Sequence, residues 1–236
     1  MRITKKRHLE IAIENIPRFE SPKIDLEQYP TSASIAADLL WNAKNLGDIS
    51  NRSLIDLGCG TGVFAISSAL LNARCAMGVD IDSSAIKIAK KTANNMKISN
   101  VKFITEDINN LENFDLENDS NLNNNSNNLN NNFNNYDYLK NLKFETAITN
   151  PPFGAQSRGK RGADRIFMKI ALNLAKVVYS FHIAETKDFV TNFYENLGGN
   201  ITHEFFYKFP LLNTYEFHTQ ESRDIEVIVL RVCKYI

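Results

Sequence analysis

Asn150, Pro151, Pro152 and Phe153 bring together groups that could hold a planar amine for chemistry. An apolar run at 145–148 precedes them and predicts the end of a buried strand. The prolines donate no hydrogen bonds and fix their own φ angles, so we expect a rigid turn. The amide oxygen and adjacent carbonyls could accept both hydrogens of an NH₂ group, while the phenyl ring stacks on its heterocycle. Such a turn suits a reaction whose nucleophile is a weak, conjugated amine. In isolation it would more often be a loop with an asparagine cap, so the rest of the chain must decide.

A glycine-rich motif, Asp-Leu-Gly-Cys-Gly-Thr-Gly, occupies residues 56–62. It lies between a predicted strand at 53–57 and a predicted helix from residue 63 to about residue 71. Glycines let the backbone approach a ligand closely, and the free N–H groups of a helix start favour an anionic group such as a carboxylate. The motif alone is a weak signal. Here it has the preceding strand and following helix that nucleotide-binding folds require.

Acidic residues lie at or just past the ends of three successive predicted strands, at 53–57, 76–80 and 101–105. They are Asp56, Asp80 and Asp107, and we expect them along the ligand-binding edge of an open sheet. Asp80 could accept both hydroxyls of a ribose. Asp82 could bind the ribose in place of Asp80. Alternatively, Asp82 is the N-cap of the next helix. Asp107, followed by Ile108, could bond an adenine amino group and cover its ring.

The chain has 236 residues, enough for one α/β domain with a substantial core. We expect an N-terminal helical extension over about residues 1–46. Beyond the turn we expect a helix from residue 164, a strand near 177–182 and a helix over about 185–197. Antiparallel β segments at 201–209 and 224–232 follow. His182 and His218 are interpreted as structural.

Positive and negative side chains balance, with 27 of each, so nucleic-acid contacts must depend on local patches. Three scattered cysteines without a C-x-x-C pair argue against disulfides and a zinc site, and no metal is expected. The absence of a signal peptide and of a membrane span predicts a cytoplasmic protein without membrane partners.

An asparagine-rich tract interrupts the pattern between the third and fourth predicted strands. Eleven of the fifteen residues at 121–135 are asparagine. A segment with so little apolar surface cannot offset its chain entropy, so we expect a disordered insertion over about residues 112–141.

A basic loop follows the Asn-Pro-Pro-Phe turn. Its cations are Arg158, Lys160 and Arg161, and Arg165 extends them. The alternative is an ordinary solvated loop. Four cations this close to the turn favour an anionic substrate and predict contacts with RNA phosphates.

These residues match a known family. The motif at 56–62, Asp80 and the turn at 150–153 resemble class I S-adenosylmethionine-dependent methyltransferases that methylate amino groups. The segments at 26–31, 78–82, 179–182 and 224–227 resemble more closely the small-subunit ribosomal RNA adenine-N6 methyltransferases of the methyltransferase-like protein 5 family and its archaeal relatives. The resemblance covers nearly the whole chain except the asparagine-rich tract.

The resemblance implies a Rossmann-like α/β fold, with a seven-stranded, mostly parallel sheet, one antiparallel strand and helices on both faces. It implies adenine-N6 methylation of RNA, with the target base held by residues 150–153, and a small zinc-binding activator protein as partner. The residues expected to bind S-adenosylmethionine are Gln28, Thr31, Asp56, Gly58, Gly60, Thr61, Gly62, Val63, Asp80, Asp107 and Ile108.

Three alternatives stay open at the level of sequence. A protein glutamine-N5 methyltransferase fits because a carboxamide also presents two hydrogens to the turn. A guanine-N2 RNA methyltransferase would use a similar amine. A non-catalytic cofactor-binding module is disfavoured, since every part of the catalytic turn is present.

Overall fold

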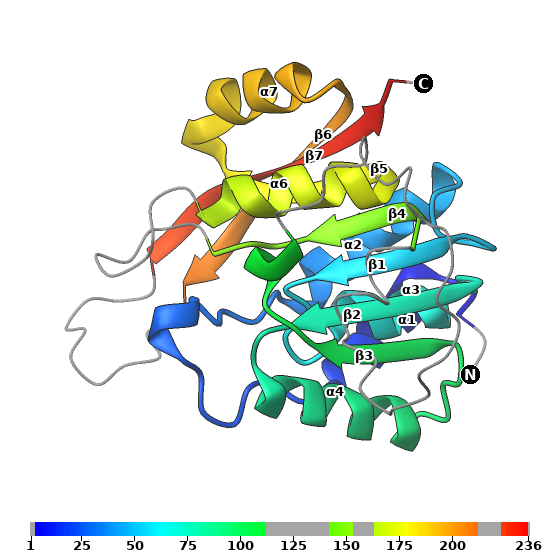
Figure 1. Cartoon of the computed structure of the whole chain (residues 1–236). Coiled ribbons are helices and arrows are strands. Elements are labelled where there is room, and N and C mark those ends of the chain that lie inside the picture. The colour runs from blue at the N-terminus through cyan, green and yellow to red at the C-terminus, as the bar shows by residue number, and fades with distance from the viewer. Residues whose placement is uncertain (1–2, 112–141, 153–162, 212–222, 236) are drawn as a thin grey trace, which may run out of the picture.

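A computed structural model describes residues 3–111, 142–152, 163–211 and 223–235 and shows one seven-stranded sheet (Figure 1). The strand order is β3-β2-β1-β4-β5-β7-β6. Strands β1 to β5 pair in parallel, and β7 is antiparallel to both of its neighbours, β5 and β6. The expected α/β fold with one antiparallel strand is therefore confirmed. The strands are β1 (Ser53–Leu57), β2 (Cys75–Asp80), β3 (Val101–Thr105), β4 (Phe144–Thr149), β5 (Ala175–Ile183), β6 (Gly199–Leu211) and β7 (Arg223–Lys234).

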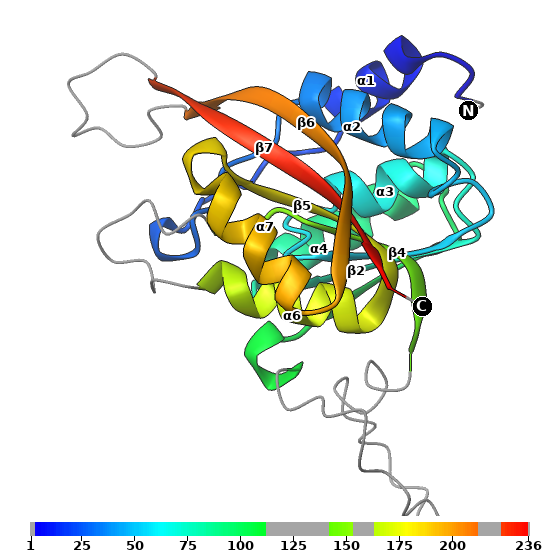
Figure 2. The same ribbon diagram turned by 90° about the horizontal axis from the view of Figure 1, so that it is seen from above.

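Helices cover both faces of the sheet (Figure 2). On one face lie α1 (Lys6–Glu14), α2 (Ala33–Asn45), α3 (Val63–Leu70) and α4 (Ser83–Asn95). On the other lie α6 (Ala163–Leu174), α7 (Lys187–Asn196) and the short helix η2 (Ile108–Leu111). The remaining single turns are η1 (Ile24–Leu26) and η3 (Ala184–Thr186). Each face packs its own apolar core.

Strand β1 runs through the middle of the sheet, and all five of its residues are buried. Its side chains alternate between the two cores: Leu54 packs with α1 to α4, while Ile55 and Leu57 pack with α6 and α7. A strand covered on both faces has a continuous apolar sequence, which is why the sequence predicts the bounds of β1 correctly.

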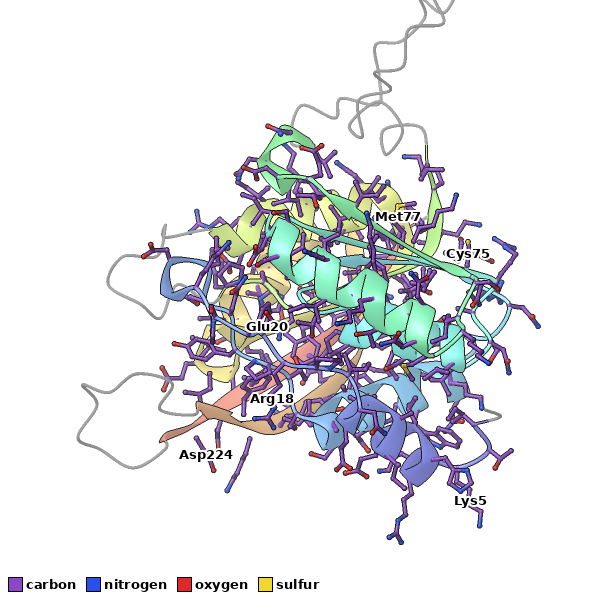
Figure 3. The ribbon with its side chains drawn as sticks, turned by 90° about the horizontal axis from the view of Figure 1, so that it is seen from below. Lys5, Arg18, Glu20, Cys75, Met77 and Asp224 are labelled. Carbon is purple, nitrogen blue, oxygen red and sulfur yellow. The ribbon has the colours of Figure 1, made fainter. Side chains whose placement is uncertain are left out.

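The N-terminal helices are part of the main core rather than an appendage to it. Leu9 of α1 and Leu39 of α2 are fully buried in the same cluster as α3. The basic residues at the start of α1 lie far from the segment that follows this helix, as the separation of Lys5 from Arg18 and Glu20 in Figure 3 shows. Lys6 pairs with Asp38, with 2.7 Å between Nζ and Oδ1. The basic N-terminus therefore lies on a solvated surface.

Several predictions fall outside the described residues: the insertion at 112–141, Phe153, the loop cations Arg158, Lys160 and Arg161, and His218. Within the described ranges, no group of three or more His, Cys, Asp or Glu side chains is arranged to hold a metal ion. None of the helices in these ranges has the length and apolar character needed to cross a bilayer.

Candidate active site

A cavity of about 940 Å³ opens where the parallel strands end. The glycine-rich loop after β1, Asp80 at the end of β2, the residues after β3 and the turn after β4 all contribute to its wall. This is the edge at which open α/β sheets bind ligands. The predicted site residues in the wall are Gln28, Thr31, Gly58, Gly60, Thr61, Val63, Asp80, Asp107, Ile108, Asn150, Pro151 and Pro152. The fold thus gathers at one cavity most of the described residues expected to bind cofactor and substrate.

The glycine-rich loop needs residues without a side chain for steric reasons. Gly60 has a φ angle of +52°, and a Cβ atom on it would lie 2.7 Å from the ring of Phe19. Gly62, at φ +90°, is the N-cap residue of helix α3 and would place a Cβ atom 2.9 Å from the ring of Phe103. Gly60 lines the cavity, whereas Gly62 does not and instead permits close packing of α3 on the sheet.

Asp80 and Asp82 have separate roles. Both oxygens of Asp80 accept backbone N–H groups, with Gly60 at 2.7 Å and Asp82 at 2.8 Å, and the side chain lines the cavity. Each oxygen keeps a second lone pair with which to bind a ligand hydroxyl. Burial raises the pKa of Asp80, while the two N–H groups act in the opposite direction. Asp82 accepts the backbone N–H of Ser84 and caps α4, as its alternative interpretation predicts.

Asp82 also anchors the segment between α1 and α2, residues 17–31, which we call the strap. It accepts hydrogen bonds from Lys23 Nζ and Gln28 Nε2, both at 2.8 Å. Burial alone would raise the pKa of Asp82, but these hydrogen bonds and those of Ser84 outweigh it and hold the pKa below its usual range. Both ends of the Gln28 amide therefore have partners within the protein: Nε2 donates to Asp82, and Oε1 accepts the backbone N–H of Lys23.

Thr31, at the end of the strap, contacts the Asn-Pro-Pro turn after β4. The side-chain nitrogen Nδ2 of Asn150 donates to Thr31 Oγ1 at 3.1 Å. The other end of the amide, Oδ1 of Asn150, is buried and has no hydrogen-bond partner among the described residues. Asn150 follows β4 directly, and Pro151 and Pro152 contribute no N–H groups, as the sequence predicts.

Asp56 and Cys59 are buried residues of the glycine-rich motif, and of the two only Cys59 lines the cavity. Asp56 is 1% exposed, does not line the cavity, and accepts the N–H of Ala65 in α3 at 3.0 Å. Burial raises its pKa to about 8, the Ala65 N–H counteracts this, and the nearby Asp80 adds to the rise. Burial also raises the pKa of the Cys59 thiol, so this sulfur is not an activated nucleophile.

We expect Asp56 to make stability fall as pH rises. Its pKa is about 8 in the folded chain and ordinarily 3.8, so the folded state retains a proton that the unfolded chain releases. The stabilisation by Asp56 is complete below its ordinary pKa of 3.8 and is lost as the pH rises through its folded-state pKa of about 8. Thermal melting between about pH 5 and pH 8.5 should show a shallower decline for Asp56→Asn than for the wild type. Asp25→Asn, at an exposed carboxylate, is the control. Equal slopes for Asp56→Asn and wild type would contradict this.

Gly60→Ala should weaken ligand binding more than it weakens the fold. An alanine at positive φ costs about 1–2 kcal/mol, and at Gly60 the new methyl group also displaces Phe19 from the loop. Gly47→Ala is the matched control, since Gly47 has φ +83° and open space around it. We expect similar losses of melting temperature in the two variants. Affinity for S-adenosylmethionine, measured by calorimetry, should fall by up to about tenfold only in Gly60→Ala, the scale of one aromatic contact. Equal affinities would show that Phe19 has no part in binding.

The structure adds residues that sequence reasoning missed. Phe19 packs over Gly60. Phe167 of α6 packs close to Gly58, and a Cβ atom added to Gly58 would lie 3.2 Å from the Phe167 ring. Phe209 of β6, 1% exposed, also lines the cavity. An aromatic residue in an otherwise polar loop is the only sequence signal for Phe19. Phe167 and Phe209 look like ordinary core residues.

Arg165 is the one predicted RNA-contacting cation within the described residues. Its guanidinium lies over the ring of Phe189, 4.8 Å from the ring centre, and its side chain is exposed. Phe189 is itself 43% exposed. Arg165 does not line the cavity, so its predicted contact with RNA would lie beside the cavity.

Comparison with known proteins agrees with this geometry. The model of a methyltransferase domain matches residues 49–150. A protein of Methanocaldococcus jannaschii, MJ0284, is 40% identical over 232 residues, which is 98% of this chain and 94% of that protein. The rRNA N(6)-adenosine-methyltransferase METTL5 of Danio rerio is 32% identical over 231 residues, 96% of this chain and 98% of that protein.

The fold is shared over its full length as well. The crystal structure of PH1948 from Pyrococcus horikoshii superposes with a TM-score of 0.78 at 30% identity, covering 99% of this chain and 100% of that one. Sequence and fold therefore agree from end to end with one group of proteins. The chain belongs to the METTL5 family of S-adenosylmethionine-dependent methyltransferases.

Proposed function

We propose that this chain transfers a methyl group from S-adenosylmethionine to N6 of an adenine in RNA, with small-subunit ribosomal RNA as the substrate. The observation that carries the proposal is Asn150, a residue of the cavity wall whose side-chain oxygen Oδ1 is buried and has no hydrogen-bond partner in the described structure. A relative that matches 96% of this chain is named as an rRNA N(6)-adenosine-methyltransferase.

The residues present fit the cofactor. Asp80 offers two carboxylate oxygens to ribose hydroxyls, and Asp107 and Ile108 follow β3 where the base would lie. Gly58 and Gly60, at positive φ, leave room for close backbone approach. Asp56 and Gly62 would act indirectly, by fixing the loop and the start of α3. When bound, S-adenosylmethionine supplies an electrophilic methyl group.

The chain's own residues prepare the amine. Asn150 Oδ1 and the Pro151 carbonyl would accept the two hydrogens of N6. These hydrogen bonds draw the nitrogen lone pair out of conjugation with the ring and stabilise the positive charge that develops on nitrogen. The rigid turn after β4 fixes both acceptors, and correct placement contributes much of the remaining rate. In this mechanism the protein needs no covalent intermediate.

A flat heterocycle suits the site better than a glutamine side chain does. Aromatic rings of Phe19, Tyr29, Phe167 and Phe209 surround the cavity, and apolar faces favour a stacked base. The adenine must leave its stack to enter, which is easiest from a single-stranded or distorted RNA site. The exposed Arg165 and the basic residues before it would contact the phosphate backbone.

Nucleoside mass spectrometry tests the proposal. The purified chain is incubated with labelled S-adenosylmethionine and small-subunit ribosomal RNA, and the nucleosides are analysed. Labelled N6-methyladenosine is the expected product. Labelled N2-methylguanosine, or label found only in glutamine of ribosomal protein, would overturn the adenine assignment. Transfer-RNA serves as the control for selectivity, since the balanced net charge argues against loose binding to every RNA.

Two further elements of the proposal depend on the family resemblance. The first is that a small zinc-binding activator protein would bind this chain. The second is that the enzyme would work in the cytoplasm, which agrees with the free thiols of Cys59, Cys75 and Cys233. Purification from native cells tests the first element. Full activity of the isolated chain, with no small protein bound to the native one, would contradict it.

A further inference from the structure

We propose that Thr31 is a positioning residue that orients the catalytic amide of Asn150, an inference that rests on the proposed function. The family resemblance assigns Thr31 to the cofactor. In the structure its hydroxyl also contacts Asn150, with Nδ2 donating to Oγ1 at 3.1 Å across 119 positions of sequence. This is the contact through which the strap reaches the catalytic turn.

The hydrogen bond matters because the two ends of an amide have opposite roles. Asn150 can accept a substrate hydrogen only through Oδ1, while an Nδ2 turned toward the amine would oppose it with hydrogens of its own. Thr31 binds Nδ2, and this leaves Oδ1 as the end without a partner among the described residues. The orientation held by Thr31 is the one that the reaction requires.

Both partners are fixed by rigid elements. Thr31 follows Pro30 and precedes Ser32, whose side chain accepts the N–H of Ile35 and caps helix α2. Helix α2 is anchored in turn by fully buried residues such as Leu39 and Leu40. Asn150 is held between the last residue of β4 and two prolines. A hydroxyl that is fixed in this way can hold a catalytic group within the narrow limits that catalysis demands.

Thr31→Val tests the role because valine keeps the shape and removes the hydroxyl. We expect the turnover number to fall about tenfold, less than the ~10²–10³-fold cost of removing an acceptor outright. The dissociation constant of S-adenosylmethionine, measured by calorimetry, should change by less than about threefold, which corresponds to less than half the free energy of a lost charged hydrogen bond. Thr31→Ser retains the hydroxyl and should restore turnover. The side-chain amide resonance of Asn150 should shift in Thr31→Val and return in Thr31→Ser.

Thr146→Val is the matched control. Thr146 lies on β4, the strand that precedes the turn. Its hydroxyl donates to the carbonyl of Asp48 at 2.6 Å, away from the cavity. Loss of this buried hydrogen bond should lower the melting temperature at least as much as Thr31→Val does, with turnover unchanged. A fall in turnover that follows stability alone would therefore appear in both variants.

A double-mutant cycle with Asn150→Ala decides the mechanism. If Thr31 acts through Asn150, Thr31→Val should have no further effect on the single-turnover rate in the Asn150→Ala background. If the two losses multiply, or if Thr31→Val mainly weakens cofactor binding, Thr31 is a cofactor ligand and the inference is wrong. The cycle is measured on whichever amine the wild type methylates. A guanine or glutamine product would thus overturn the proposed function and still leave the role of Thr31 measurable.

Discussion

Replacing Asn150 with alanine is expected to lower the turnover number by ~10²–10³-fold, the usual cost of losing one fixed acceptor for transition-state charge. The dissociation constant of S-adenosylmethionine should stay nearly constant. Asn150 lies on the turn after β4, whereas most of the residues expected to hold the cofactor lie at or just after the ends of β1, β2 and β3. Single-turnover kinetics and calorimetry measure the two quantities separately.

The control for this experiment is Asn100→Ala. Asn100 donates from Nδ2 to the Ala73 carbonyl at 2.7 Å, near the start of β3 and therefore at the opposite edge of the sheet. It should keep full turnover, whatever it costs in stability. Loss of cofactor binding in Asn150→Ala would mean that Asn150 is misassigned as a substrate acceptor.

Asp80→Ala should have the opposite signature, with weaker cofactor binding as the primary defect. Two charge-assisted hydrogen bonds to ribose hydroxyls contribute roughly 1.5–3 kcal/mol each, so we expect the dissociation constant to rise at least about 10²-fold. The same change removes the acceptor for the N–H of Gly60, which should add to the loss by loosening the loop.

An analogue separates these two effects. The wild type should bind S-adenosylhomocysteine much more tightly than its 2′,3′-dideoxy form, because only the former carries the ribose hydroxyls. Asp80→Ala should lose most of this preference, since the partner of the hydroxyls is gone. A variant that still discriminates between the two ligands would show that Asp80 only supports the loop.

Sequence patterns predict the layout of this fold well where local chemistry decides it. Strands β1 and β3 have the predicted bounds, because each is a short run of strand-forming residues bounded by turn-forming residues. Antiparallel pairing of β6 and β7 is confirmed, and the alternative prediction for Asp82, as a helix N-cap, describes its geometry. The sequence also predicts that Asp80, Asp107 and Asn150 would share one edge, since parallel strands that end together bring their following residues together.

The sequence alone therefore determined the class of fold and the edge of the sheet at which the cavity lies, since these depend on local periodicity and on the residues that end each strand. Only the tertiary structure decided which side chains meet. Gln28 and Asp82 lie 54 positions apart, and Thr31 and Asn150 lie 119 apart. No local pattern encodes such pairs. The packing of α1 and α2 on the sheet brings the strap across the cavity, and the position of the strap determines which polar atoms bond to protein and which remain for substrate.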